Sequence, residues 1–290
     1  MIGLFLLLFM GLNSQAGTFE PEQLYFGKSG ERASLVDLAL YTPKGSTIII
    51  GEYHDNVSHH DHQIALINVL IDSGHKVALG MEFLQTPFQN QVNEYLLGQL
   101  KEQDFLAQIG WGMNNFGLYR EQIKLAYDSS KTVLAINAPS SLTSRVSKVG
   151  IDALSDEEKS LLPPDFKLGN DKYYQRFKDA MGEHVPAEKI MNYFQAQSIW
   201  DDTMAWNIAS WRQNQVQQKT DKVTLVIIIG DFHVRYFGGT PDRLTQRTGM
   251  TPVVISQMNM QDLTDDEVSF EIASDPESGQ RADFVWTSKE

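Results

Sequence analysis

The sequence predicts an α/β fold in which a mostly parallel central sheet is flanked by helices, with a helical insertion between the third and fourth core strands. Short apolar runs rich in β-branched residues alternate with longer amphipathic segments along the chain, and this alternation is typical of βαβ units. The runs are almost continuous in Val, Ile and Leu. Such a pattern indicates strands that are buried on both faces of a parallel sheet.

The predicted strands are short and well separated. Four are clear, a fifth follows them, and a sixth is expected near the end of the chain: residues 46–51 (STIIIG), 76–80 (KVALG), 132–136 (TVLAI), 222–230 (KVTLVIIIG), 251–256 (TPVVIS) and 268–272. Apolar residues at helical spacing predict helices over residues 60–73, 89–100 and 119–129. Ser58 or Asp55 is placed to cap the first of these helices.

The predicted insertion covers about residues 140–217 and is mostly helical over residues 156–217, with prolines as punctuation. No internal repeat or low-complexity stretch divides the chain. Its 290 residues, 42% of them hydrophobic, are enough for one sizeable core or at most two small ones. We therefore expect residues 17–290 to form a single α/β domain.

The N-terminal segment resembles a secretory signal. Residues 2–12 (IGLFLLLFMGL) form an apolar run too short to span a bilayer comfortably, and Ser14 and Ala16 precede Gly17 as in a cleavage site. No Lys or Arg precedes the run, and a buried N-terminal strand or helix is the alternative. The sequence predicts a signal peptide over residues 1–16 and export to the periplasm or cell envelope, with a position peripheral to a membrane as an option.

Composition excludes several classes of function. The formal net charge is −13, and a surface this acidic repels phosphate backbones, so nucleic acid is excluded as an expected partner. The chain contains no cysteine. It therefore has no disulfide, no thiolate nucleophile, no zinc–thiolate site and no cysteine that could carry a lipid anchor.

Ionisable residues follow the core strands where they end. The first strand runs into His54, the second into Glu82 and the fourth into His233, while Asn137 follows the third. Because the carboxyl ends of parallel strands share one edge of a sheet, where ligands bind, we expect His54, Glu82 and His233 to converge on one crevice. The first and fourth strands end in similar elements: a glycine, an acidic residue, an aromatic residue and a histidine.

This set suits two kinds of chemistry. His54, Glu82 and His233 form a plausible set of ligands for a divalent metal, or an acid/base set in which a carboxylate orients a histidine for catalysis. The alternative is that strand-end histidines merely bond to nearby backbone. For one histidine we would favour that alternative, but the convergent set favours function.

Two further segments could contribute to this site. In the histidine-rich tract over residues 54–63, we expect His54 and His60 to face the site, with His59 and His62 either in the site or in solvent. After His233 come Arg235 and Tyr236, a cation and a phenol beside the predicted crevice. A tyrosinate is a known haem-iron ligand, and an arginine can pair with a propionate. A half-buried loop tyrosine is the alternative.

The segment at residues 195–209 is expected to be a helix with Trp200 and Met204 on one face, a spacing more typical of core than of a site. Asp201 or Asp202 could support the site from this helix, although the pattern favours a structural role.

At these residues the sequence resembles the ChaN-like haem-binding protein family, which groups with the Tiki proteases and erythromycin esterases in one superfamily. The matching segments, which extend over most of the predicted mature chain, are GEYHDNVSHHDHQ (51–63), GMEF (80–83), GWGMNNFGLYREQIKLA (110–126), AQSIWDDTMAWNIA (196–209) and IGDFHVRYFGGTP (229–241). Some members are lipoproteins, which this chain without cysteine does not match. Asp231 and Phe232 stand where a smaller pair is common.

The resemblance implies an envelope protein that binds haem and is linked to iron acquisition. Tyr236 is then the expected iron ligand, with Arg235, His54, His60 and His233 around the haem. The implied partners are a haem or iron transporter, an outer-membrane receptor or a second copy of the chain.

Tiki-type relatives imply a different use of His54, Glu82 and His233, as ligands of a divalent metal for hydrolysis. We favour haem binding over a metal-dependent or His/Glu-based hydrolase, because the pattern along the whole chain follows the ChaN-like branch. Whether the protein is an enzyme is left open.

Overall fold

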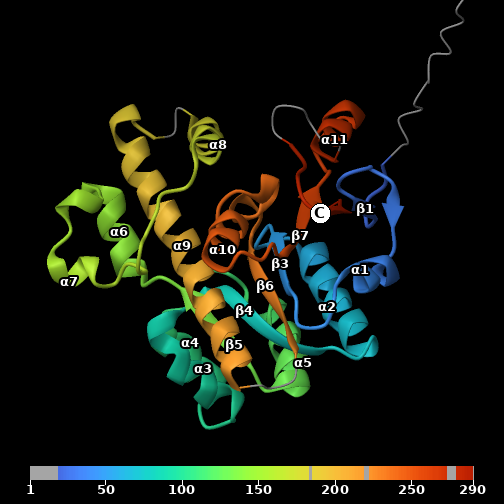
Figure 1. Cartoon of the computed structure of the whole chain (residues 1–290), viewed down its shortest axis with the longest axis horizontal. Helices are drawn as coiled ribbons and strands as arrows, with labels where there is room; N and C mark the ends of the chain where they lie inside the picture. Colours follow the sequence, from blue (N-terminus) through green and yellow to red (C-terminus); the bar gives the residue numbers. More distant parts are fainter. Residues whose placement is uncertain (1–18, 183–184, 219–221, 273–278, 290) are drawn as a thin grey trace, which may run out of the picture.

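A computed structural model describes residues 19–182, 185–218, 222–272 and 279–289. It confirms an α/β fold built around one mixed, mostly parallel sheet (Figure 1). The predicted signal peptide, residues 1–16, lies outside the described residues. No helix within the described ranges is both long and apolar enough to cross a membrane.

The sheet has eight strands in the order β2-β1-β8-β7-β3-β6-β4-β5. The strands are β1 (Leu24–Phe26), β2 (Arg32–Ala33), β3 (Thr47–Glu52), β4 (Lys76–Gln85), β5 (Val133–Asn137), β6 (Val223–Gly230), β7 (Val253–Asn259) and β8 (Phe284–Ser288). Each pairing from β8 to β5 is parallel, whereas β1 pairs antiparallel with both β2 and β8. The five strands predicted between residues 46 and 256 correspond to β3–β7.

The helices lie on both faces and around the edges of the sheet. They are α1 (Leu35–Tyr41), α2 (Val57–Asp72), α3 (Gln89–Leu96), α4 (Glu102–Ile109), α5 (Arg120–Ser130), α6 (Ser140–Val149), α7 (Asp156–Lys159), α8 (Asp171–Met181), α9 (Ala187–Gln218), α10 (Thr240–Thr248) and α11 (Asp265–Ile272). Between β5 and β6 the chain forms α6, α7, α8 and the long α9, which crosses one face of the sheet (Figure 1).

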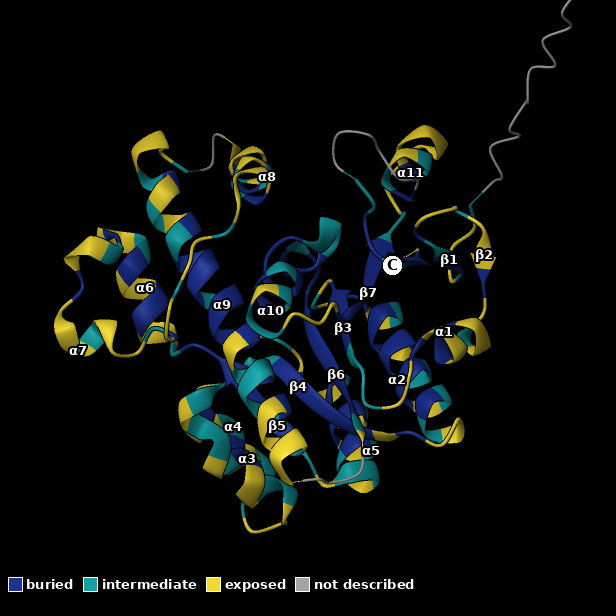
Figure 2. Ribbon diagram, viewed as in Figure 1, coloured by how far each residue is buried: buried dark blue, intermediate teal, exposed yellow. Residues whose placement is uncertain are grey.

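The side chains of each strand point alternately to the two faces of the sheet, and this divides the hydrophobic core into two layers. Successive side chains of a strand point to opposite faces, and β3 follows this rule: Ile48 and Ile50 pack on the side of α2 and α5, whereas Ile49 packs on the side of α9 and α10. All three are fully buried, as are most residues of the central strands (Figure 2). The apolar runs therefore form strands because both of their faces are covered by helices.

Two local predictions are wrong. Residues 268–272 form part of α11 and not a strand, because Thr264 and Glu267 bond reciprocally across the first turn and acidic residues favour a helix start. The last strand lies further on, at β8. The cap of α2 is Asn56, and neither Ser58 nor Asp55, since the side chain of Asn56 accepts a hydrogen bond from the N–H of His59.

Candidate functional site

The carboxyl ends of β3, β4 and β6 bring the three predicted residues together. Glu52 at the end of β3 pairs in register with Gly230 at the end of β6, and Glu82 lies in the last part of β4. The Nε2 atom of His233 lies 3.5 Å from Glu82 Oε1, and the ring of His54 packs against Gly230. Side chains from three distant parts of the sequence thus share one edge of the sheet.

Glu82 is held as a carboxylate by its surroundings. The backbone N–H of Gly230 donates to Glu82 Oε2 at 2.6 Å. Burial by itself raises the pKa of Glu82, but the charges of His233 and His54, together with this backbone hydrogen bond, outweigh burial and lower the pKa. Glu82 therefore stays ionised at neutral pH.

His233 lies between two carboxylates. Its Nδ1 atom is 2.8 Å from Asp201 Oδ1 on α9, and its other ring nitrogen faces Glu82. Burial acts to lower the pKa of His233, but Asp201 and then Glu82 outweigh burial and raise the pKa well above its usual value. The imidazole is therefore protonated at neutral pH, and it joins α9 electrostatically to the strand ends.

His54 is the accessible imidazole of the site. Its side chain is 37% exposed, and its Nδ1 atom lies 3.0 Å from Oε1 of the buried Glu52. Tyr119 and Gln63 each donate to Glu52 at 2.5 Å and fix that carboxylate. Burial acts to lower the pKa of His54, but the hydrogen bond to Glu52 and the charge of Glu82 raise it overall. Within the described residues His54 Nε2 makes no hydrogen bond, so it is available to a ligand. We call Glu52, His54, Glu82, Asp201 and His233 the strand-end cluster.

Two glycines make this packing feasible. A Cβ atom on Gly230 would lie 3.1 Å from the ring of His54 and 3.4 Å from Glu82 Oε2, so a side chain there would fill the space between these two groups. A Cβ atom on Gly51 would lie 2.5 Å from Asp231 Oδ1. Gly51 therefore needs to be glycine for this close approach, and Gly230 leaves room for His54 and Glu82.

His60 lies beneath the strand-end cluster. It is buried, its Nε2 atom is 3.1 Å from the carbonyl oxygen of His54, and its Nδ1 atom is 3.8 Å from Glu52 Oε2. The ring also packs edge-on against Tyr119. His60 thus supports the segment that carries His54.

His59 and His62 lie neither in the strand-end cluster nor in solvent. His59 is fully buried and bonds to Ser288 at 3.0 Å, and burial, with His62 and His60 nearby, lowers its pKa to about 3. His62 stacks on Trp286 and bonds to Glu22 at 2.8 Å. Both imidazoles pack α2 against the β1–β8 side of the sheet.

Tyr236 lies in a loop with unusual backbone geometry. Tyr236 and Phe237 both have positive φ angles, 60° and 52°, a conformation that costs non-glycine residues about 1 kcal/mol or more each. The N–H of Tyr236 donates to the carbonyl oxygen of Arg281 at 2.6 Å, and its hydroxyl donates to Glu271 at 3.1 Å. Burial and the charge of Glu271 raise the pKa of Tyr236, although Arg281 opposes them.

Two guanidinium groups flank Tyr236 and have no carboxylate partner among the described residues. Arg176 lies over the rings of Tyr236 and Tyr173, 5.1 and 5.6 Å from their centroids, and Arg235 lies over the ring of Phe232. Neither arginine makes an ion pair with any residue that the structure describes. The Nε atom of Arg235 is buried and has no hydrogen-bond partner in this part of the chain.

Tyr236 is separate from the strand-end cluster but connected to it. The hydroxyl of Tyr173 donates to Asp201 at 2.9 Å, and Arg176 lies over both Tyr173 and Tyr236. Asp201 in turn bonds to His233. The predicted residues therefore form two adjoining groups: His54, Glu82 and His233 at the strand ends, and Arg235 and Tyr236 in the following loop.

The predicted metal centre receives no support from the geometry. Across the described ranges, no group of three or more His, Asp or Glu side chains is arranged to hold a metal ion. The ring nitrogens of His233 instead face Asp201 and Glu82, and one nitrogen of His54 faces Glu52.

Sequence reasoning left the choice between Asp201 and Asp202 open, and it missed Glu52 and Glu271. Asp201 enters the strand-end cluster, whereas Asp202 pairs with Arg247 at 2.7 Å, and spacing alone did not separate these two neighbours. Glu52 stands two residues before His54 at the end of the same strand, a signal that could have identified it. Glu271 carries no comparable motif.

The position of His233 between Asp201 and Glu82 predicts that Asp201→Asn loses stability in a pH-dependent way. Folding raises the pKa of His233 above its ordinary value of 6.5. The contribution of the protonated His233 to the free energy of unfolding is therefore complete below pH 6.5, and it is lost as the pH rises through the raised pKa. We expect Asp201→Asn to lose ~3 kcal/mol of unfolding free energy below about pH 6, and less as pH increases. Urea denaturation across pH would measure this, with the exposed Asp128→Asn as control. An equal loss of unfolding free energy at every pH would contradict the ionic interaction between Asp201 and His233.

The match to a known family comes from the sequence itself. The profile described as "Haem-binding uptake, Tiki superfamily, ChaN" matches residues 42–244, more than half of the chain, and this range contains both groups of site residues. No curated protein matches the chain.

The chain is similar to several solved structures, and the first of them shares its fold. One is described as "Cofacial heme binding to ChaN of Campylobacter jejuni", with 15% identity and a TM-score of 0.63, covering 91% of this chain and 95% of that one. The type III effector HopBA1 gives 13% identity and a TM-score of 0.48 over 96% and 100% of the two chains. A mutant of the erythromycin esterase EreC in its open conformation gives 10% and 0.44 over 82% and 77%. With the profile match over residues 42–244, the resemblance to ChaN is confirmed, and the chain belongs to the ChaN family of haem-binding uptake proteins in the Tiki superfamily.

Proposed function

We propose that this protein is an exported haem-binding protein linked to iron acquisition, which holds haem at the carboxyl edge of the sheet with Tyr236 as the iron ligand. Membership of a haem-binding family supports haem as the ligand. The similar Campylobacter protein binds haem cofacially, so a homodimer is the assembly we propose, with a haem or iron transporter or receptor as partner. Residues 1–16 would direct export.

The observation that carries this proposal is the pair of arginines beside Tyr236. Haem presents two propionate groups, and Arg176 and Arg235 are two guanidinium groups without a carboxylate partner among the described residues. A buried guanidinium N–H without a hydrogen bond, such as Arg235 Nε, is costly unless a ligand satisfies it. The residues present therefore fit a haem whose propionates reach Arg176 and Arg235.

The loop conformation supports the same assignment. Strained backbone persists where the surrounding structure holds it in place, and such strain is concentrated at functional sites. Here the backbone bond from Tyr236 to Arg281 holds the tyrosine in its left-handed conformation. Bound haem would supply a Lewis-acidic iron and strong visible absorption. Without bound haem, burial and the charge of Glu271 raise the pKa of Tyr236 and keep its phenol protonated.

Hemin titration with each arginine replaced tests the proposal. Wild-type protein should develop a Soret band with high-spin charge-transfer features. Arg176→Gln and Arg235→Gln should each weaken hemin binding about tenfold, since each loses a charge-assisted contact. The exposed Arg145→Gln serves as control. A wild-type spectrum that equals that of free hemin would reject haem binding, and size-exclusion chromatography on the same samples would report the dimer.

One observation favours a second function, a His/Glu-based hydrolase. The buried Glu52 orients the partly exposed His54, and a histidine held in this way can act as a general base on water. Hydrolysis of p-nitrophenyl acetate that is lost in His54→Ala but kept in Tyr236→Phe would support it. Equal rates in wild type and His54→Ala would reject it.

A further inference from the structure

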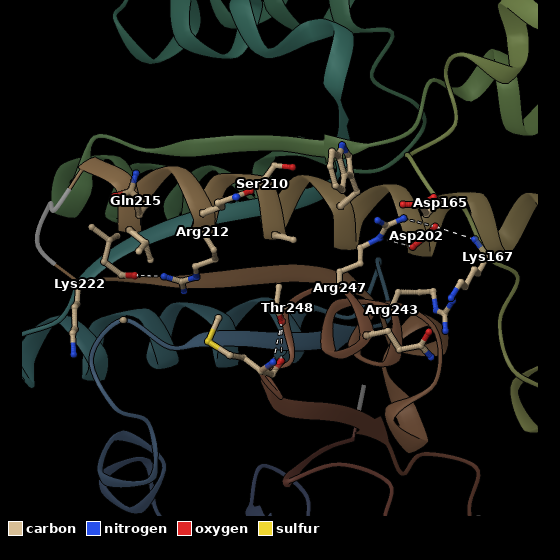
Figure 3. A pocket seen from close by; sticks show the side chains of 18 of the residues that line it. Asp165, Lys167, Asp202, Ser210, Arg212, Gln215, Lys222, Arg243, Arg247 and Thr248 are labelled. Atoms are coloured by element: carbon tan, nitrogen blue, oxygen red, sulfur yellow. Dashed lines mark hydrogen bonds and ion pairs between the residues drawn. The ribbon is translucent and has the colours of Figure 1, made fainter.

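A large cavity begins at the opposite, amino-terminal edge of the sheet and runs along α9 as far as Asp202. It has a volume of about 860 Å³ and lies among the second half of α9, α10 and the first residue of β6. Figure 3 shows Gln215 and Lys222 at one end of it and Asp165, Lys167 and Asp202 at the other. No residue of the strand-end cluster lines it, and neither does Tyr236. We call it the α9 pocket.

The charge of the α9 pocket is opposite to that of the protein. The whole chain carries a net charge of −13, yet among the described residues that line the pocket six are Lys or Arg and only two are Asp. One of these two acids, Asp202, is already paired with a cation, because it accepts two hydrogen bonds of 2.7 Å from Arg247. A concave surface of one charge concentrates ligands of the other, so the pocket attracts anions.

Arg212 is a buried cation that has no carboxylate partner among the described residues. Its guanidinium donates to Thr47 Oγ1 at 2.9 Å, to the carbonyl oxygen of Val223 at 2.6 Å and to that of Ser46. All three are neutral acceptors at the start of the strands. Burial lowers the pKa of Arg212 to about 10, which still leaves it charged at neutral pH. This uncompensated charge lies in the wall of the pocket.

A second buried cation is incompletely satisfied. Arg243 is 4% exposed, pairs through one nitrogen with Asp242 at 3.0 Å, and leaves its buried Nε without a partner among the described residues. Lys44 and Lys167 also line the pocket, and neither makes an ion pair in the part of the chain that the structure describes. Unpartnered donors therefore line several parts of the pocket.

The pocket also has an apolar wall. The side chain of Trp206 is 37% exposed, and Arg247 lies 5.2 Å from its ring centroid. Met250, which is 61% exposed, lines the pocket as well. An indole face and a thioether beside cationic groups suit a flat, apolar ring that carries an acidic group.

We propose that the α9 pocket binds a small organic anion, in which an aromatic or similarly flat body packs on Trp206 while carboxylate or phosphate groups meet Arg212, Arg243 and Lys167. The volume of about 860 Å³ is in the range of small-molecule sites, ~300–1,000 Å³. The site is distinct from the proposed haem site, because neither the residues of the strand-end cluster nor Tyr236 line the α9 pocket.

Binding of 8-anilinonaphthalene-1-sulfonate, an aromatic anion, tests this site in the full chain without haem. We expect saturable binding of one probe per chain, followed by fluorescence, with inorganic phosphate competing at constant ionic strength. Lys167→Glu and Trp206→Ala should each raise the dissociation constant at least about tenfold. Both side chains are accessible, so both variants should fold, which circular dichroism would verify.

The matched control is Lys28→Glu, the same charge change on an exposed residue after β1. It should bind the probe like the wild type. Equal affinity of the probe for all variants, or no competition by phosphate, would overturn the proposal. The probe would then bind nonspecifically to apolar surface outside the α9 pocket.

Discussion

Replacing Tyr236 by phenylalanine is expected to weaken hemin binding by about 100-fold, or ~2.7 kcal/mol. The substitution removes only the hydroxyl, so the strained loop, Arg176 and Arg235 remain to hold the propionates while the iron loses its protein ligand. The high-spin charge-transfer features should disappear from the visible spectrum with the affinity. Residual weak binding through the arginines would give a Soret band that lacks these features.

The control for this variant is Tyr193→Phe, which removes a hydroxyl from an exposed tyrosine on α9. It should bind hemin as the wild type does. If Tyr236→Phe kept both the affinity and the charge-transfer features, another side chain would be the ligand, and the accessible His54 would be the next to replace.

Replacing Arg281 by methionine is expected to cost about 3–5 kcal/mol of unfolding free energy. Arg281 is 1% exposed, and it bonds to the buried Asp231 at 2.8 Å, to Ser256 at 2.8 Å and to Glu271. Without the guanidinium, Asp231 would remain buried as an uncompensated charge. Urea denaturation of wild type and variant would measure the loss.

A double variant separates the cost of the unpaired charge from the cost of lost packing. Asp231→Asn combined with Arg281→Met removes both charges, so it should be more stable than Arg281→Met alone. If the double variant were less stable than the single one by the full cost of Asp231→Asn, the two residues would act independently and the ion pair would contribute nothing.

The central strands could be predicted because their physical cause is local. β3 and β6 are continuous apolar runs, and such runs can be buried on both faces only inside a parallel sheet. The edge of the sheet could not be predicted in the same way. β1 and β2 have three and two residues, too few to show a pattern, and α11 depends on a capping interaction at Thr264 that outweighs the strand-like sequence after it.

The meeting of His54, Glu82 and His233 followed from topology, since parallel strands end at one edge. The partners of these residues did not follow, because they depend on side-chain distances that spacing does not define. Asp201 and Asp202 are neighbours on α9, and only the packing of the helix decides which one reaches His233. The separation of Tyr236 from the strand-end cluster also comes from tertiary contacts, those of its loop with Arg281 and Glu271.

The most direct test of where haem binds is the paramagnetic broadening of backbone amide signals in the hemin complex. High-spin ferric iron broadens nearby signals with a steep dependence on distance, and the two ends of the eight-residue β6 lie about 23 Å apart at ~3.3 Å per residue. We predict that the amide signals of Gly230, Arg235 and Tyr236 broaden beyond detection while those of Thr47 and Val223 stay sharp. The reverse pattern would place haem at the amino edge and contradict the account.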